Sequence, residues 1–220
     1  IGNLETDDFT ISIWFNPDVL GTGSPSHHHN ARLMSCHDGV DGNSWVLLVD
    51  NVQGFGIYGA GNTFITSGAS EVSTNSWHHG VVTRSGNTVT VYLSGQQVAQ
   101  NTTTTGSYSA VDGSADGNFT IGMEHVRIGS YWWGFDGRIR DVAMWDKALT
   151  STEIQSIYNS NCPYDVSSNG GYYNSASNLI AYWPCDDSVG SSILTDKSGN
   201  GHHGTIGSNL SILSIKPVNL

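Results

Sequence analysis

The sequence predicts an all-β protein, a two-sheet antiparallel jelly-roll sandwich with one short helix in the C-terminal half. Residues 9–15 place Phe9, Ile11 and Ile13 on one face and polar Thr10 and Ser12 on the other, which is the period of a half-buried strand. Seven or more such short segments recur between polar turns, as in sandwiches and jelly rolls. Only 12% of the residues are charged, against roughly 25% in average proteins.

The predicted strands follow one another with short connections. A hairpin is expected where residues 77–85 and 88–95 flank the turn at Ser85, Gly86 and Asn87. The other strand candidates are residues 9–15, 31–36, 45–50, 54–59, 118–123 and 137–145.

One helix is expected after these strands. Thr150 and Glu153 have the spacing of a capping box, and Ile154, Ile157 and Tyr158 form an apolar stripe at helical spacing. We expect this helix to cover a sheet edge or one end of the sandwich.

The 220 residues fit one large β domain. We expect residues 1–159 to form the main sandwich, residues 160–178 an irregular connection, and residues 179–220 a segment that packs back on the same sandwich. Cys162 and Cys185 flank a Gly/Ser/Asn-rich stretch, so the alternatives are a disulfide that pins the C-terminal segment or two separate thiols. Cys36 is expected to be a buried thiol.

The net charge of −11 argues against nucleic acid and anionic membranes as partners, because both bind basic surfaces. Metal cations and neutral polar ligands fit it better, although the charge also has a simpler explanation in solubility. No apolar run is long enough to insert into a membrane. The chain opens directly on a predicted strand, so any targeting segment is expected to have been removed or to lie outside these residues.

No catalytic pattern is apparent, so we expect the protein not to be an enzyme. Glycosidases use two carboxylates that face one cleft, but Glu71, Glu124 and Glu153 have no acidic residue two positions away. No G-x-S-x-G motif occurs. His78 and His79 begin a strand, and alternation predicts that they point to opposite faces.

Calcium is the expected cofactor. It takes six to eight oxygen ligands, typically from loops rich in Asp, Asn and Gly. Two stretches fit, one with Asp41 and Asn43 and one with Asp196 and Asn200, although the same residues also form ordinary turns.

An aromatic loop is the expected ligand contact. Tyr131, Trp132 and Trp133 follow one another in a polar, Gly-containing segment. Exposed aromatic faces suit sugar rings, whereas packing against the core is the alternative role for one of the tryptophans.

Several segments together resemble laminin-G-like and pentraxin-like domains of the concanavalin A-like lectin/glucanase superfamily. FDGRIRDVAMWDKALTSTEIQSIYN resembles their last strand and terminal helix, and WHHGVVTRSGNTVTVYLSGQQVA resembles their central hairpin. FTISIWFNP is similar to an early strand. LIAYWPCDDSVGSSILTDKSGNGHHGTI is similar to an element that usually precedes that strand. Its C-terminal position here implies that it either folds back to fill the first-strand place or begins a second copy.

The resemblance implies specific ligands. Glu124, Asp41 and Asn43 would match a pentraxin calcium site, although His125 and Val126 replace the acidic residues that follow in the family, which implies one ion. A second, structural calcium ion is implied at Asp141, with Asp196 and Asn200 completing it. The expected ligand-binding residues are Tyr131, Trp132, Trp133 and His125.

The function expected from the resemblance is that of a non-catalytic, calcium-stabilised carbohydrate-binding or adhesion module on a virion or cell surface, because surface proteins of marine phages and bacteria have a similar layout. Its expected partner is a glycan or glycoconjugate in an extracellular setting. The alternative is a structural virion subunit, a capsid decoration or fibre protein, whose partners are other subunits or copies of itself in a homo-oligomer. A glycoside hydrolase ranks last.

Overall fold

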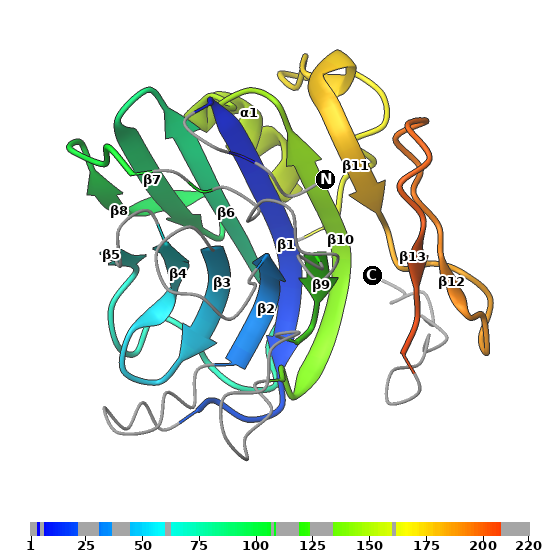
Figure 1. Cartoon of the computed structure of the whole chain (residues 1–220), viewed down its shortest axis with the longest axis horizontal. Helices are drawn as coiled ribbons and strands as arrows, with labels where there is room; N and C mark the ends of the chain where they lie inside the picture. Colours follow the sequence, from blue (N-terminus) through cyan, green and yellow to red (C-terminus); the bar gives the residue numbers. More distant parts are fainter. Residues whose placement is uncertain are drawn as a thin grey trace.

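The structure is a computed structural model that describes residues 4, 7–21, 31–36, 45–59, 63–106, 108, 119–123, 134–159 and 162–207. The main strands of the described chain form two antiparallel sheets (Figure 1). Sheet A contains, in spatial order, β11 (Leu179–Trp183), β10 (Gly137–Trp145), β1 (Phe9–Pro17), β6 (His78–Ser85), β7 (Thr88–Leu93) and β8 (Gln96–Asn101). Sheet B contains β5 (Thr63–Thr66), β4 (Gly54–Gly59), β3 (Trp45–Asp50), β2 (Ala31–Cys36) and β9 (Phe119–Ile121).

Three smaller elements complete the described chain. Helix α1 spans Ser151–Tyr158, and the short 3-10 helix η2 spans Ala176–Asn178. Strands β12 (Ile193–Leu194) and β13 (Gly204–Thr205) form a separate ribbon, which lies beside β11 in Figure 1. The predicted jelly-roll sandwich with one short helix is confirmed.

The core lies between the two sheets, where alternate residues of each strand face one another. From β1 it receives Phe9, Ile11, Ile13 and Phe15, as the alternation predicts. Phe15 stacks on Phe55 of β4 with ring centroids 5.4 Å apart. Burying side chains of this size contributes about 1.5–3 kcal/mol each. The other large core side chains include Leu33, Met34, Trp45, Leu47, Val49, Ile57, Val82, Val89, Val91, Val142, Met144 and Trp183.

Helix α1 packs on the outer face of sheet A. The Thr150 hydroxyl accepts from the Glu153 N–H, and the Glu153 carboxylate accepts from the Thr150 N–H, so the predicted capping box is confirmed. Ile154 and Ile157 lie in the same buried cluster as strand residues of sheet A. The expectation that the helix covers an edge or an end was therefore wrong, because Val81, Ala143 and Trp145 on the outer face of sheet A are apolar and need a cover.

Residues beyond the helix pair with the edge of sheet A. β11 is antiparallel to β10, with Val142 opposite Trp183 and Met144 opposite Ala181. The Trp183 ring stacks on Phe119 of β9 at 5.5 Å, so it bridges the edges of both sheets. On the other side of β11, the Tyr182 N–H donates to Asp196 and the Lys197 N–H donates to the Tyr182 carbonyl. The outer edge of β11 therefore carries hydrogen-bond partners.

Cys162 and Cys185 are not joined by a disulfide. Cys162 is exposed, whereas the Cys185 thiol donates to the Trp183 carbonyl. Of the two alternatives, the structure has separate thiols. Cys36 is buried, as expected. No helix in the described ranges is long and apolar enough to cross a membrane.

Candidate functional site

The outer face of sheet A is closed by a third layer. Trp145 and Ala143 of β10 and Val81 of β6 are buried beneath α1 and residues 162–178. The Tyr173 hydroxyl, which is part of this layer, accepts from the Trp145 ring N–H at 2.8 Å and donates to the Val166 carbonyl at 3.0 Å. A sugar has no access to this face where the layer covers it.

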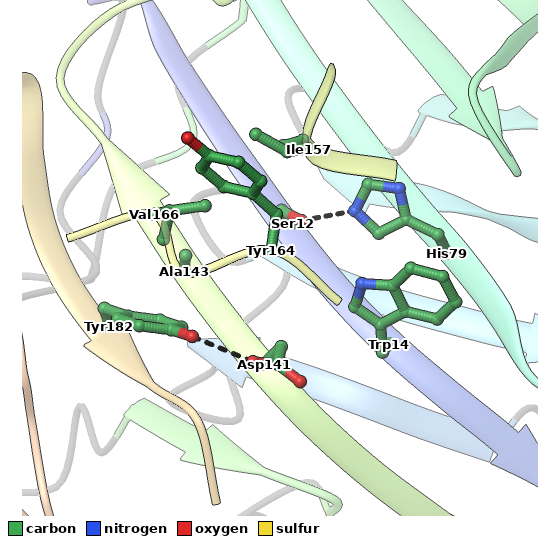
Figure 2. Close-up of a pocket in the computed structure, with 9 residues that line it drawn as sticks. All are labelled: Ser12, Trp14, His79, Asp141, Ala143, Ile157, Tyr164, Val166 and Tyr182. Atoms are coloured by element: carbon green, nitrogen blue, oxygen red, sulfur yellow. Dashed lines mark hydrogen bonds between the residues drawn. The ribbon is translucent and has the colours of Figure 1, made fainter. Parts of the chain in front are cut away.

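Beneath this layer lies a serine–histidine pair that resembles half of a catalytic triad. Ser12 of β1 and His79 of β6 are 2.8 Å apart between Oγ and Nε2, and both are almost completely buried. Figure 2 shows the pair, with Tyr164, Val166 and Ile157 among the residues that line the same cavity.

The surroundings of His79 do not fit a catalytic base. Within the described ranges its Nδ1 atom has no hydrogen-bond partner, so no described carboxylate orients the ring as in a triad. The ring stacks on Trp14 at 4.9 Å and on Tyr158 at 5.9 Å. Burial lowers the pKa of His79 to about 3, so the ring is neutral at pH 7. We interpret it as a packed core histidine, with its neighbour His78 on the opposite face beside Phe15.

Asp141 is held in a β-bulge at the other end of the cavity. The register between β1 and β10 shifts between Ser12 and Trp14, and Asp141 has a φ of 47°, a left-handed conformation that Asp tolerates better than most residues. Its carboxylate accepts from the Tyr182 hydroxyl at 2.8 Å and from Arg140 Nε at 2.7 Å. Burial raises the pKa of Asp141, while Arg140 and Tyr182 act in the opposite direction.

The cavity is too small for an organic ligand. Its volume is about 10 Å³, which is near the limit for a single water molecule.

The Cys185 thiol does not fit a nucleophile either. Burial and the nearby Asp141 raise the pKa of Cys185 to about 12, so the thiol stays protonated at pH 7.

Asp196 and Asn200 attach the C-terminal segment to β11. The Asp196 carboxylate accepts four hydrogen bonds, from the N–H groups of Tyr182, Ser198 and His202 and from the Ser198 hydroxyl. Burial works to raise its pKa, but these hydrogen bonds outweigh burial and lower it. The Asn200 amide donates to the carbonyls of Leu179 and Ile180.

These contacts give Asp141, Asp196 and Asn200 protein partners. In the described part of the chain, no three His, Cys, Asp or Glu residues form a group that could hold a metal ion. The calcium site expected at these three residues stays a prediction.

The remaining predicted site residues lie outside the described residues, but the residues at the ends of their loops are paired with each other. Residues 37–44 connect Cys36 to Trp45, which are register partners in β2 and β3. Residues 124–133 connect Met123 to Gly134, which form an antiparallel bridge. These two loops carry Asp41, Asn43, Glu124, His125, Tyr131, Trp132 and Trp133.

The ends of the two loops meet at a hydroxyl cluster on the outer face of sheet B. Ser35 Oγ lies 2.8 Å from Thr120 Oγ1 and donates to the Met123 carbonyl at 3.2 Å. Thr120 Oγ1 donates to the same carbonyl. We call Ser35, Thr120 and Met123 the loop junction. It fixes the backbone just before Glu124 beside the strand that leads into Asp41 and Asn43.

Sequence reasoning missed the loop junction and the Ser12–His79 pair. Alternation places Ser12 and Ser35 on the outer faces of their strands, but only the packing of α1 shows that Ser12 is buried. Nothing in the sequence indicates that Thr120 and Ser35 are neighbours, because 85 positions separate them.

A two-sheet jelly roll with a helix on one outer face is an architecture of lectin-like domains. The sequence matches a laminin-G family model, described as the concanavalin A-like lectin/glucanases superfamily, over residues 2–155. The chain belongs to this superfamily, and the resemblance seen in the sequence is confirmed at that level. No curated protein sequence matches the chain significantly.

Solved structures share the fold at low sequence identity. A candidate carbohydrate-binding protein from Bacteroides ovatus has a TM-score of 0.65 and 19% identity, covering 92% of this chain and 53% of its own. This chain thus spans about half the length of that protein. A heptameric SAP-like pentraxin from Limulus polyphemus has a TM-score of 0.53 and 17% identity, covering 91% of this chain and 84% of its own. The CBM40 of the Ruminococcus gnavus IT-sialidase, solved with α2,3-sialyllactose, has a TM-score of 0.55 and 17% identity, covering 70% of this chain and 84% of its own.

The buried His79 makes the free energy of unfolding depend on pH. Its pKa is about 3 in the folded state against the ordinary histidine value of 6.5, so the unfolded state binds more protons between these pH values and the folded state loses stability as the pH falls. Between pH 7.5 and pH 5 the loss is about 2 kcal/mol. Asp141 acts in the opposite sense because its pKa is raised.

Urea denaturation of the wild type and of His79→Gln across this pH range measures the effect. The variant keeps a hydrogen-bonding side chain that does not titrate, so its stability should fall about 2 kcal/mol less than that of the wild type. Equal pH dependence in the two proteins would show that His79 is not buried in its neutral form.

Proposed function

We propose that this chain is a non-catalytic carbohydrate-binding module whose ligand binds at the two loops that meet at the loop junction. The observation that carries the proposal is that the residues at the ends of both loops are fixed beside Ser35. The Met123 carbonyl accepts from the Ser35 and Thr120 hydroxyls, and Cys36 pairs with Trp45. A binding loop with fixed ends loses less conformational entropy when it binds a ligand.

The family and the fold neighbours support this function. The superfamily contains lectins and glucanases. Two of the fold neighbours are described as a candidate carbohydrate-binding protein and a carbohydrate-binding module bound to sialyllactose. At such low identity these neighbours support the fold directly and the ligand by analogy.

The described carboxylates favour binding over catalysis. Asp141 accepts from Arg140 and Tyr182, and Glu153 accepts from Thr150 and Ser175. Asp141 is buried under the third layer and Glu153 is buried within it, whereas glycosidase carboxylates flank the sugar in an open cleft.

In the proposed site, Asp41, Asn43 and Glu124 hold a calcium ion that orders the loops and offers an open position to sugar hydroxyls. Tyr131, Trp132 and Trp133 stack on a sugar ring, and His125 supplies a hydrogen bond. We place the module on an extracellular cell or virion surface, where it would mediate adhesion. A second calcium ion at Asp141, Asp196 and Asn200 would help to fix the C-terminal segment.

Replacing the central aromatic residue of the loop tests the proposed ligand directly. Trp132→Ala should abolish binding on a glycan array, because losing an aromatic stack removes a dominant contact. Tyr172→Ala is the matched control, since Tyr172 is 74% exposed but lies in the segment that covers sheet A. Assembly that depends on protein concentration, with no glycan bound by the wild type, would identify a structural subunit instead.

Removing calcium tests the proposed metal. A ligand that binds only the folded state raises its stability, so saturating chelator should lower the Tm of the wild type. Asp41→Ala should reduce this chelator-dependent shift to the part that the second ion contributes, and Asp186→Ala, at an exposed ion pair with Lys197, should retain the full shift. An unchanged wild-type Tm in chelator contradicts the calcium site.

A further inference from the structure

A single row of side chains crosses the whole outer face of sheet B. The register pairs Thr120 of β9 with Ser35 of β2, Ser35 with Val46 of β3, Val46 with Tyr58 of β4, and Tyr58 with Phe64 of β5. We call these five residues the cross-strand row. It begins at the loop junction and ends at an aromatic pair.

The row faces away from the core. Cys36, Leu47, Ile57 and Ile65, each next to a member of the row, belong to the buried core cluster. Because successive side chains of a strand point to opposite faces, the row lies on the outer face. With about 4.8 Å between neighbouring strands, Phe64 lies roughly 14 Å from Ser35.

The aromatic pair is the exposed end of the row. Phe64 is 39% exposed, whereas Val46 in the middle of the row is 1% exposed. The Tyr58 and Phe64 ring centroids are 4.4 Å apart at an interplanar angle of 37°, so each ring limits the movement of the other. Phe64 and Tyr172 are the two aromatic side chains that are largely exposed within the described ranges.

The described neighbours of the pair on the same face are small and uncharged. Gly56, two positions before Tyr58 on the same face, contributes no side chain, and a Cβ there would lie 2.2 Å from the Ile65 carbonyl oxygen. Thr66 is the register partner of Gly56 and supplies a hydroxyl. No member of the cross-strand row is charged, which suits a neutral ligand on a chain of net charge −11.

We propose that Phe64 and Tyr58 form a second carbohydrate subsite, where Phe64 stacks on a neutral sugar ring of an oligosaccharide whose other end occupies the two loops. The inference rests on the proposed function, since it extends the same ligand along sheet B. A separation of roughly 14 Å exceeds one sugar ring, so the ligand is an oligosaccharide and not a monosaccharide.

The simpler role for the pair is structural, because cross-strand aromatic pairs stabilise sheets by about 0.2–1 kcal/mol. That role predicts that Phe64 substitutions change the Tm and leave binding untouched. The subsite predicts a loss of affinity that depends on the length of the ligand.

Calorimetric titration of wild type and Phe64→Leu with oligosaccharides of two and six glucose units tests the subsite. The probes are α-1,4-, β-1,3- and β-1,4-linked, and 3′-sialyllactose is included as a short charged ligand. The wild type should bind a hexasaccharide more tightly than the disaccharide of the same linkage. Phe64→Leu should weaken hexasaccharide binding about fivefold to tenfold, as expected for one aromatic stack, and leave disaccharide binding unchanged.

Tyr172→Leu is the matched control and should bind both lengths as the wild type does. A Phe64→Leu protein that binds the hexasaccharide normally, or that loses affinity equally for both lengths, overturns the subsite while the proposed function stands. A wild type that binds none of the probes overturns the proposed function and the subsite with it. Melting temperatures of the variants separate a binding defect from a folding defect.

Discussion

The complete burial of β1 on both faces is the constraint on which the rest of the structure depends. All nine residues of Phe9–Pro17 are buried, although a two-layer sandwich covers only one side of a strand. The outward side chains of β1 therefore need a third layer. Thr10 makes this connection directly, because its hydroxyl donates to the Lys147 carbonyl and accepts from the Leu149 N–H. It thereby ties the central strand to the turn that starts α1.

Polar contacts as well as apolar packing hold the third layer on sheet A. Because the layer is fixed there, it determines which sheet a ligand can reach. Glu153 caps α1 and also accepts from the Ser175 hydroxyl, to which Lys147 donates. Burial works to raise the pKa of Glu153, but its hydrogen bonds outweigh burial and lower it. The carboxylate thus stays charged and connects the helix to the segment that follows it. Since this layer occupies the outer face of sheet A, both proposed subsites lie on sheet B.

The sequence predicted those parts of the fold that depend on local pattern. The alternation in β1, the hairpin of β6 and β7 and the capping box at Thr150 were all found. The strands β5 and β8 were not singled out, because TFIT and QQVAQN lack a clear apolar face. The predicted position of α1 was wrong, since the position of a helix on a sheet depends on long-range packing. Asp196 was expected as a calcium ligand because its loop has the Asp, Asn and Gly residues of calcium loops, which also form ordinary turns. The four hydrogen bonds that its carboxylate accepts could not be predicted from that pattern. The loop junction depends on the register between β2 and β9, which no local pattern encodes.

Hydrogen–deuterium exchange with and without a bound hexasaccharide tests most directly the claim that sheet B carries the ligand and sheet A does not. The account predicts slower exchange on binding in β2, β4, β5 and residues 119–123, with no change in α1 or in residues 164–178. Slower exchange confined to α1 and residues 164–178 would contradict it, because the ligand would then bind to the layer that covers sheet A.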